Sequence, residues 1–213
     1  MAQRTIHYLF GEILSRHVQL KDKNRFLLGS ILPDAYADVA DRDKTHYKVK
    51  WENKSFLDFE AFREEYLDFI CRDDLYLGYY MHLVEDAFYR QVFYNEHKKM
   101  PRGKDGVIRL HQDYHILNSY IVQKYGLKNE LHMENDMEVE TFHKIADFRI
   151  EAFLEEMSKD FQEDIVGETY YITEVMADEF IEKYVPIAEE ELKSIQKGIS
   201  TLCAKDFIWE KNR

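Results

Sequence analysis

Residues 76–88 read YLGYYMHLVEDAF, and this stretch constrains the fold more than any other part of the chain. Its apolar residues recur at the three- and four-residue spacing of a helix that packs against a core. His82 and Asp86 stand among them, and residues four apart on a helix lie on one face, one turn apart. The stretch therefore predicts a core helix that carries an imidazole and a carboxylate side by side.

The rest of the chain also favours helices, because its 213 residues include only 8 Gly and 3 Pro to break them. Polar loops are expected over 38–51 and 127–140, and a turn over 98–106. These features predict an all-α fold, a single bundle-like domain over 1–213. The predicted helices are 5–18, a short one in 24–36 that breaks at Pro33, 56–70, 74–97, 107–125 ended by Gly126, 141–161, and 170–197 with a break or kink near Pro186.

Charge and cysteine content restrict the partners and the compartment. The formal net charge of −12 disfavours stable binding to nucleic acid or to an anionic membrane, because both would repel the protein. Cys71 and Cys203 form no CxxC motif, the first residues do not have the order of a secretory signal, and no apolar run approaches the ~20 residues of a membrane span. We expect a cytoplasmic protein without a transmembrane segment. The sequence leaves its oligomeric state undetermined.

Five side chains in the first half of the chain are candidates for one metal site. His7 lies beside the apolar stripe of the first helix, Asp34 follows Pro33, His46 lies in a polar segment, and His82 and Asp86 share the central helix. Imidazole nitrogens and carboxylate oxygens are common zinc ligands, and two ions about 3.5–4 Å apart can clamp a phosphoryl group. Taken singly, each has an ordinary alternative: a core histidine bonded to a carbonyl, a turn carboxylate, or a solvated histidine.

Four segments in this half resemble the zinc-dependent phospholipase C family and its distant single-strand nuclease relatives. In order, they are HYLFGEIL, FLLGSILPDAY, THY and YLGYYMHLVEDAFY. The resemblance implies an all-α fold with a metal site mainly from residues 5–90 and zinc as the cofactor, two ions in the main site. The implied zinc ligands are His7, Asp34, His46, His82 and Asp86, with Asp86 as the bridge between the ions.

The sequence also departs from the secreted members of that family. Those members bind metal through the amino group of the mature N-terminal residue, whereas His7 here lies six residues beyond Met1. They hold a third zinc ion as well, for which the nearest candidates are His111 and His115 in RLHQDYHILN, with Asp113 pointing elsewhere on the helix. The same ligands would also suit another divalent transition metal. The remaining candidates, which have no comparable partner and are expected to be surface or structural, are His97, His132 and His143.

The implied activity is phospholipase C-like hydrolysis of phosphate esters by a metal-bound hydroxide, with a small phosphorylated substrate or a lipid head group. Asp34 is the candidate catalytic residue, taking a proton from water. Glu85 lies about 100° from Asp86 around the helix and is expected to be solvated. A phosphohydrolase of the HD type is disfavoured, since no HD dipeptide occurs. The alternative is a non-catalytic helical binding or scaffold protein with a structural or vestigial metal site.

Overall fold

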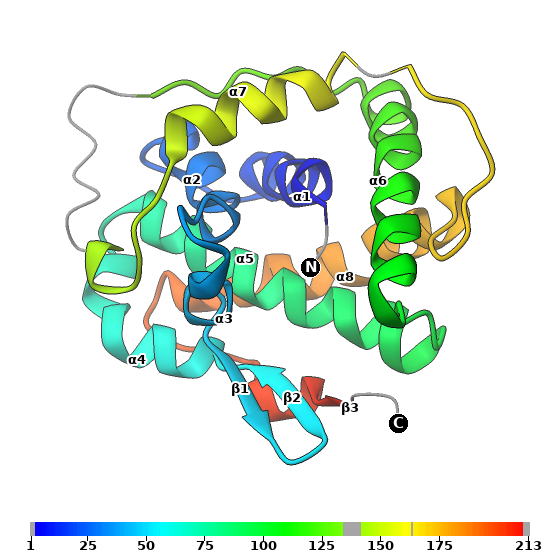
Figure 1. Cartoon of the computed structure of the whole chain (residues 1–213). Coiled ribbons are helices and arrows are strands. Elements are labelled where there is room, and N and C mark those ends of the chain that lie inside the picture. Colours follow the sequence, from blue (N-terminus) through cyan, green and yellow to red (C-terminus); the bar gives the residue numbers. More distant parts are fainter. Residues whose placement is uncertain (1–2, 134–141, 163, 211–213) are drawn as a thin grey trace.

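The computed structural model describes residues 3–133, 142–162 and 164–210. The chain is 65% helical, and the described part contains eight α-helices and one small antiparallel sheet (Figure 1). The mostly helical class predicted from the sequence is confirmed, whereas the single domain over 1–213 stays a prediction. The helices are α1 Arg4–His17, α2 Lys23–Gly29, α3 Arg42–Thr45, α4 Phe59–Ile70, α5 Asp74–Arg90, α6 Gly103–Tyr125, α7 Ile150–Asp160 and α8 Glu174–Ile195; the strands are β1 Lys48–Trp51, β2 Lys54–Leu57 and β3 Trp209–Glu210.

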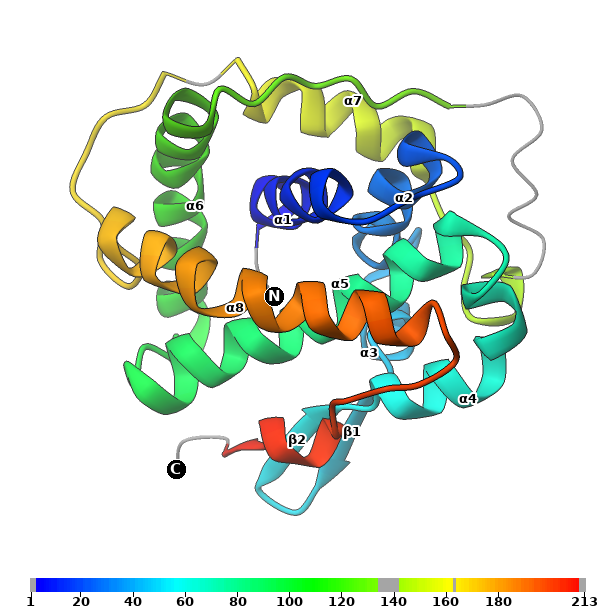
Figure 2. The same cartoon turned by 180° about the vertical axis from the view of Figure 1, so that it is seen from behind.

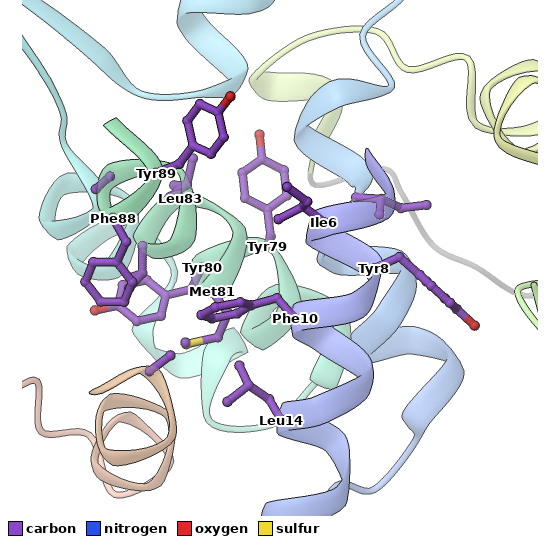
Figure 3. Close-up of a cluster of buried hydrophobic side chains, with 14 of the residues drawn as sticks. Ile6, Tyr8, Phe10, Leu14, Tyr79, Tyr80, Met81, Leu83, Phe88 and Tyr89 are labelled. Carbon is purple, nitrogen blue, oxygen red and sulfur yellow. The ribbon is translucent and has the colours of Figure 1, made fainter. Parts of the chain in front are cut away.

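Helix α5 is the central element. It packs against α1, α2, α4 and α8, and α8 crosses it on the face seen in Figure 2. Every one of its 17 residues is buried, so it has no solvent-exposed face. Figure 3 shows Ile6, Phe10 and Leu14 of α1 pointing toward the apolar side chains of α5. The apolar surface buried around α5 is the main stabilising contribution to this part of the fold.

Two glycines let α2 and α5 approach each other closely. A Cβ atom on Gly78 of α5 would lie 2.1 Å from the Phe26 carbonyl oxygen, and one on Gly29 of α2 would lie 2.1 Å from the Leu75 oxygen. Any side chain at either position would therefore force the helices apart. The same approach brings Ser30, the C-cap of α2, into contact with His82.

The small sheet was not predicted. Strand β1 occupies the end of the segment 38–51 that was expected to be a loop, and β2 includes Phe56, where a helix was expected to begin. Helix α4 begins instead at Phe59, where the Asp58 side chain accepts a hydrogen bond from the Ala61 N–H and so caps the helix. The sheet is completed by β3, in which Trp209 pairs with Ser55 from far earlier in the chain.

The second half of the chain differs from prediction in one long helix. The helix expected over 141–161 is instead a short turn, Phe142–Lys144, followed by α7 from Ile150; residue 141 lies outside the described residues. The intervening segment runs beside residues 35–37 and is held there by backbone hydrogen bonds, Ala37 N–H to the Asp147 oxygen and Arg149 N–H to the Ala35 oxygen. Backbone pairing with a distant segment thus replaces the helix there.

The sequence predicted that helices break or end at Pro33, Gly126 and Pro186. Helix α8 runs through Pro186 without ending, because burial of Val185 and Ala188 on either side outweighs the hydrogen bond that proline cannot donate. Helix α2 ends at Gly29, and Pro33 lies beyond it in a 3-10 turn, Leu32–Asp34. Helix α6 ends as predicted at Gly126, whose φ of 60° suits glycine.

Two further expectations concern loops and membrane spans. Of the loop predicted over 127–140, residues 127–133 contain neither helix nor strand, and 134–140 lie outside the described residues. None of the described helices combines the length and the apolar character that crossing a bilayer requires.

Candidate metal centre

The five predicted donors converge on one buried point between α1, α3 and α5. His7 comes from α1, Asp34 from the turn after α2, His46 from the C-cap of α3, and His82 and Asp86 from α5. His46 Nε2 lies 3.2 Å from Asp34 Oδ1 and 3.3 Å from His82 Nε2. His7 Nε2 lies 3.8 Å from both Asp34 Oδ2 and Asp86 Oδ1. Segments far apart in sequence thus place three imidazoles and two carboxylates within a few ångströms.

Each of the three imidazoles is held in one orientation by a hydrogen bond at Nδ1. The pairs are His7 with the Glu85 carboxylate (2.8 Å), His46 with the Arg42 carbonyl (2.9 Å) and His82 with the Ser30 carbonyl (2.8 Å). An oxygen acceptor at Nδ1 fixes the tautomer, so that the proton is on Nδ1 and the lone pair is on Nε2. In the form that binds metal, the three Nε2 lone pairs therefore face the two carboxylates.

This donor set fits a divalent cation. It presents lone pairs and carboxylate oxygens to one another with few protons between them, and two of its buried atoms, His7 Nε2 and Asp34 Oδ1, have no hydrogen-bond partner. Buried polar groups without partners are costly unless an ion or water satisfies them. Two groups of three donors lie within metal-binding distance, His7–Asp34–His82 and His46–His82–Asp86. His82 belongs to both groups, and its Nε2 can serve only one ion.

The two carboxylates are held in the ionised form. Burial by itself would raise the pKa of Asp34, but the neighbouring imidazoles of His46, His82 and His7 lower it more, so the net pKa is lowered. Burial likewise acts to raise the pKa of Asp86, but the guanidinium of Arg90, 3.0 Å away, lowers it together with His7 and His46, so the net pKa is lowered. Ionised carboxylates are the form that binds metal.

The imidazoles respond differently to the same surroundings. Burial and the nearby charge of His7 lower the pKa of His82, which favours the neutral form that binds metal. Burial also acts to lower the pKa of His7, but the adjacent Glu85 carboxylate, together with Asp34 and Asp86, raises it to about 9. His7 must therefore release a proton before it can bind a cation at neutral pH.

Sequence reasoning missed the roles of Glu85 and Arg90. Glu85 was expected to be solvated, and this was wrong: it is 1% exposed and accepts the Nδ1–H of His7. The expectation assumed that α5 has a solvent-facing side, which it lacks. Arg90 is four residues after Asp86, so its ion pair with that carboxylate was readable from helical spacing.

A pocket of about 330 Å³ opens beside the centre, and we call it the Asp34 pocket. Asp34 is the only one of the five donors in its wall, with a side chain that is 8% exposed, against 2% or less for the other four. A ligand in the pocket would therefore meet the centre at Asp34. The other lining residues are Gln3, Arg4, Tyr36, Val39, His111, Tyr114, His115, Asn118, Arg149, Phe153 and Asp160.

His111 and His115 line the same pocket from α6, as their four-residue spacing allows. Neither belongs to a close group of three metal-binding side chains among the described residues, so the third metal site stays a prediction. Asp113 is buried elsewhere, where it accepts the backbone N–H groups of residues 170–172. His97 is half-buried and pairs with a glutamate, His132 is exposed, and the side chain of His143 lies outside the described part of the chain.

A helical fold that encloses imidazoles and carboxylates beside an open pocket has the features of a metal-binding protein whose site a ligand can reach. The comparison with protein families identifies which one. A model of the family "zinc dependent phospholipase C" matches residues 1–206, and the chain therefore belongs to the zinc-dependent phospholipase C family of phosphoric ester hydrolases. No curated protein and no solved structure matches the chain significantly. The family resemblance and the hydrolase class predicted from the sequence are thereby confirmed.

Proposed function

We propose that the protein hydrolyses the phosphate ester bond of a phospholipid or a small phosphorylated substrate with two zinc ions. The observation that carries the proposal is the orientation of three buried imidazoles, each anchored at Nδ1 and each presenting Nε2 to a pair of ionised carboxylates. Family membership supports zinc and the reaction class. The assignment of His7, Asp34, His46, His82 and Asp86 as ligands, with Asp86 as the bridge, belongs to this proposal.

The residues of the centre would have different roles, which follow from their positions. His7, His46 and His82 would hold the ions, and Asp86, kept ionised by Arg90, would offset the repulsion between them. Bound zinc lowers the pKa of water to about 7 and stabilises negative charge on phosphoryl oxygens. Asp34, which lines the pocket, would also accept a proton from water where it is not fully committed to metal.

Three further parts of the proposal come from the sequence. A third ion at His111 and His115, cytoplasmic localisation, and no stable binding to nucleic acid all stay predictions. Cell fractionation tests the second. The metal count described next tests the first, and binding of labelled oligonucleotides at physiological salt tests the third.

The main experiment joins metal analysis to an ester panel. Protein purified without added metal should contain about two zinc ions per chain and should hydrolyse phosphodiesters or phosphomonoesters. Chelation should abolish hydrolysis and lower the melting temperature, since metal binds the folded form preferentially, and zinc should restore both. A metal-containing protein whose melting temperature does not respond to chelator would contradict a site built into the core.

The same panel separates an enzyme from a protein with a structural or vestigial metal site. A structural site is closed by protein ligands, whereas a catalytic site keeps a position open to substrate. The Asp34 pocket favours the open type. Stoichiometric zinc with no hydrolysis of any ester in the panel would support the structural alternative.

A further inference from the structure

The wall of the Asp34 pocket contains a buried amide that no group in the described part of the protein satisfies. Gln3 lines the pocket and is 5% exposed. Neither the nitrogen nor the oxygen of its carboxamide has a hydrogen-bond partner among the described residues. Such burial is costly, because the amide has lost its bonds to water and has gained none from the protein. A ligand in the pocket could supply the missing bond.

The position of Gln3 is fixed relative to the metal centre. Gln3 is the N-cap of α1, and its carbonyl accepts the backbone N–H of His7, the first of the proposed zinc ligands, at 3.3 Å. The next residue, Arg4, binds both carboxylate oxygens of Asp160 on α7. The backbone is thus held in place, whereas the last torsion of a glutamine side chain is soft. The amide can therefore turn toward a ligand while the rest of the residue stays where it is.

Within the described part of the chain, the Gln3 side chain makes no structural hydrogen bond that would explain its burial. It does not cap α1, although the residue occupies the N-cap position. Asn118, the second amide among the described lining residues, accepts a hydrogen bond from the Thr5 hydroxyl at 2.5 Å. The two arginines of the wall are paired with carboxylates. Gln3 therefore contributes a neutral donor that is not yet engaged.

A phosphoryl oxygen matches this donor. A glutamine amide has two N–H donors, and the oxygens of a phosphate group accept hydrogen bonds that are stronger for being charged. A neutral donor also adds no positive charge beside Asp34 and Asp86. It can hold an anion without competing with a metal ion for those carboxylates, as a lysine or an arginine would.

We infer that the carboxamide of Gln3 is a substrate-binding group, whose nitrogen donates a hydrogen bond to a phosphoryl oxygen of an ester held at the metal centre. The inference rests on the proposed function for the position of the phosphoryl group. It adds a residue that binds the ligand and lies outside the proposed set of metal ligands. The same phosphoryl chemistry is present in phospholipids and in soluble phosphate esters.

Gln3→Met tests the inference, because methionine has nearly the size of glutamine but carries no N–H donor. Binding of inorganic phosphate to the zinc-loaded protein would be measured by calorimetry. We expect the variant to bind phosphate about tenfold more weakly than wild type, the effect of losing one hydrogen bond to a charged group. Its zinc content should be unchanged. Its melting temperature should equal or exceed that of wild type, since a buried amide without a partner has been removed.

The matched control is Gln112→Met, at an exposed glutamine of α6 outside the pocket lining, which should leave phosphate binding unchanged. Undiminished phosphate binding by Gln3→Met, or no phosphate binding by wild type, would overturn the inference. A lower melting temperature or lost zinc in Gln3→Met would overturn it as well, by showing that the amide supports the fold or the ions. Phosphate binding that depends on Gln3, without hydrolysis of any ester, would keep the inference and reject the hydrolase.

Turnover of two esters identifies the source of the phosphoryl group. The ratio kcat/KM would be compared between wild type and Gln3→Met for dihexanoyl phosphatidylcholine and for p-nitrophenyl phosphate. A loss restricted to the first assigns the contact to a lipid substrate, and a loss restricted to the second assigns it to a soluble one. Losses with both place the contact on the phosphoryl group that they share, and no loss with either would count against the inference.

Discussion

Two helices of this protein carry potential metal ligands at the same four-residue spacing, and their surroundings differ. His82 and Asp86 on α5 are fully buried, and each has a fixed partner, the Ser30 carbonyl and Arg90. His111 and His115 on α6 line an open pocket and belong to no close group of three donors in the described part of the chain. Spacing alone therefore does not distinguish the two pairs, whereas burial and a fixed hydrogen-bond partner for each donor make the α5 pair the stronger candidate for a metal site.

The largest expected effect comes from breaking the α5 pair. Asp86→Asn keeps size but removes the charge that would offset two dications, so both zinc ions and hydrolysis should be lost. His46→Ala should weaken mainly one ion, because an imidazole binds a single metal. Metal per chain and turnover of a generic phosphate ester would be measured for both variants. An Asp86→Asn protein with two ions and wild-type turnover would rule out the bridging role.

The next effect concerns the helix packing under the α5 pair. Gly78→Ala would place a Cβ atom 2.1 Å from the Phe26 oxygen, so α2 must shift away from α5. We expect a loss of about 3 kcal/mol in the free energy of unfolding, measured by urea denaturation. The matched control on α6 is Gly126→Ala, which meets no atom within 4 Å but strains a φ of 60°. It should cost only about 1 kcal/mol. Equal losses would contradict a close approach specific to α5.

Glu85→Gln sharpens the comparison by removing the charge of the group that anchors His7 and leaving every metal donor in place. Mutation of such a partner typically costs 10–100-fold in metal affinity. In the wild type, Glu85 is the main cause of the pKa of His7 being raised to about 9, so zinc must displace a proton at any lower pH. Apparent affinity should then rise with pH up to about 9.

In Glu85→Gln the proton on His7 is held less tightly, so the rise should level off at lower pH. Zinc titrations against a competing chelator between pH 6 and pH 9.5 measure both effects. Parallel pH profiles for the two proteins would show that Glu85 does not act through His7.

The smallest expected effect comes from breaking the α6 pair. His111→Ala and His115→Ala change side chains exposed to the pocket, so the free energy of unfolding should stay within about 0.5 kcal/mol of wild type. Metal per chain would be counted for both variants. Loss of one equivalent in each, with two retained, establishes the third site; unchanged content limits the pair to lining the pocket.

The part of the site that could be predicted from the sequence is the part set by local helical geometry. The spacing of His82 and Asp86 and the placement of Asp34 after Pro33 need no knowledge of tertiary contacts. Glu85 was misjudged because its environment depends on the four helices around α5. The pairing of Ser55 with Trp209, and that of Arg149 with Ala35, join segments whose proximity no local pattern encodes.

The Arg90 side chain that pairs with Asp86 is itself packed against a residue near the end of the chain, and this has a consequence for the order of events during synthesis. The guanidinium of Arg90 lies 4.6 Å from the centroid of the Trp209 ring, and Trp209 sits in the strand that completes the sheet. A chain growing on the ribosome carries all five donors once residue 86 has emerged, whereas this ring arrives only with residue 209. Zinc that met the nascent chain early would find its proposed ligands present but the Arg90–Asp86 pair not yet packed against Trp209. We therefore expect tight metal binding only after the C-terminal strand has formed.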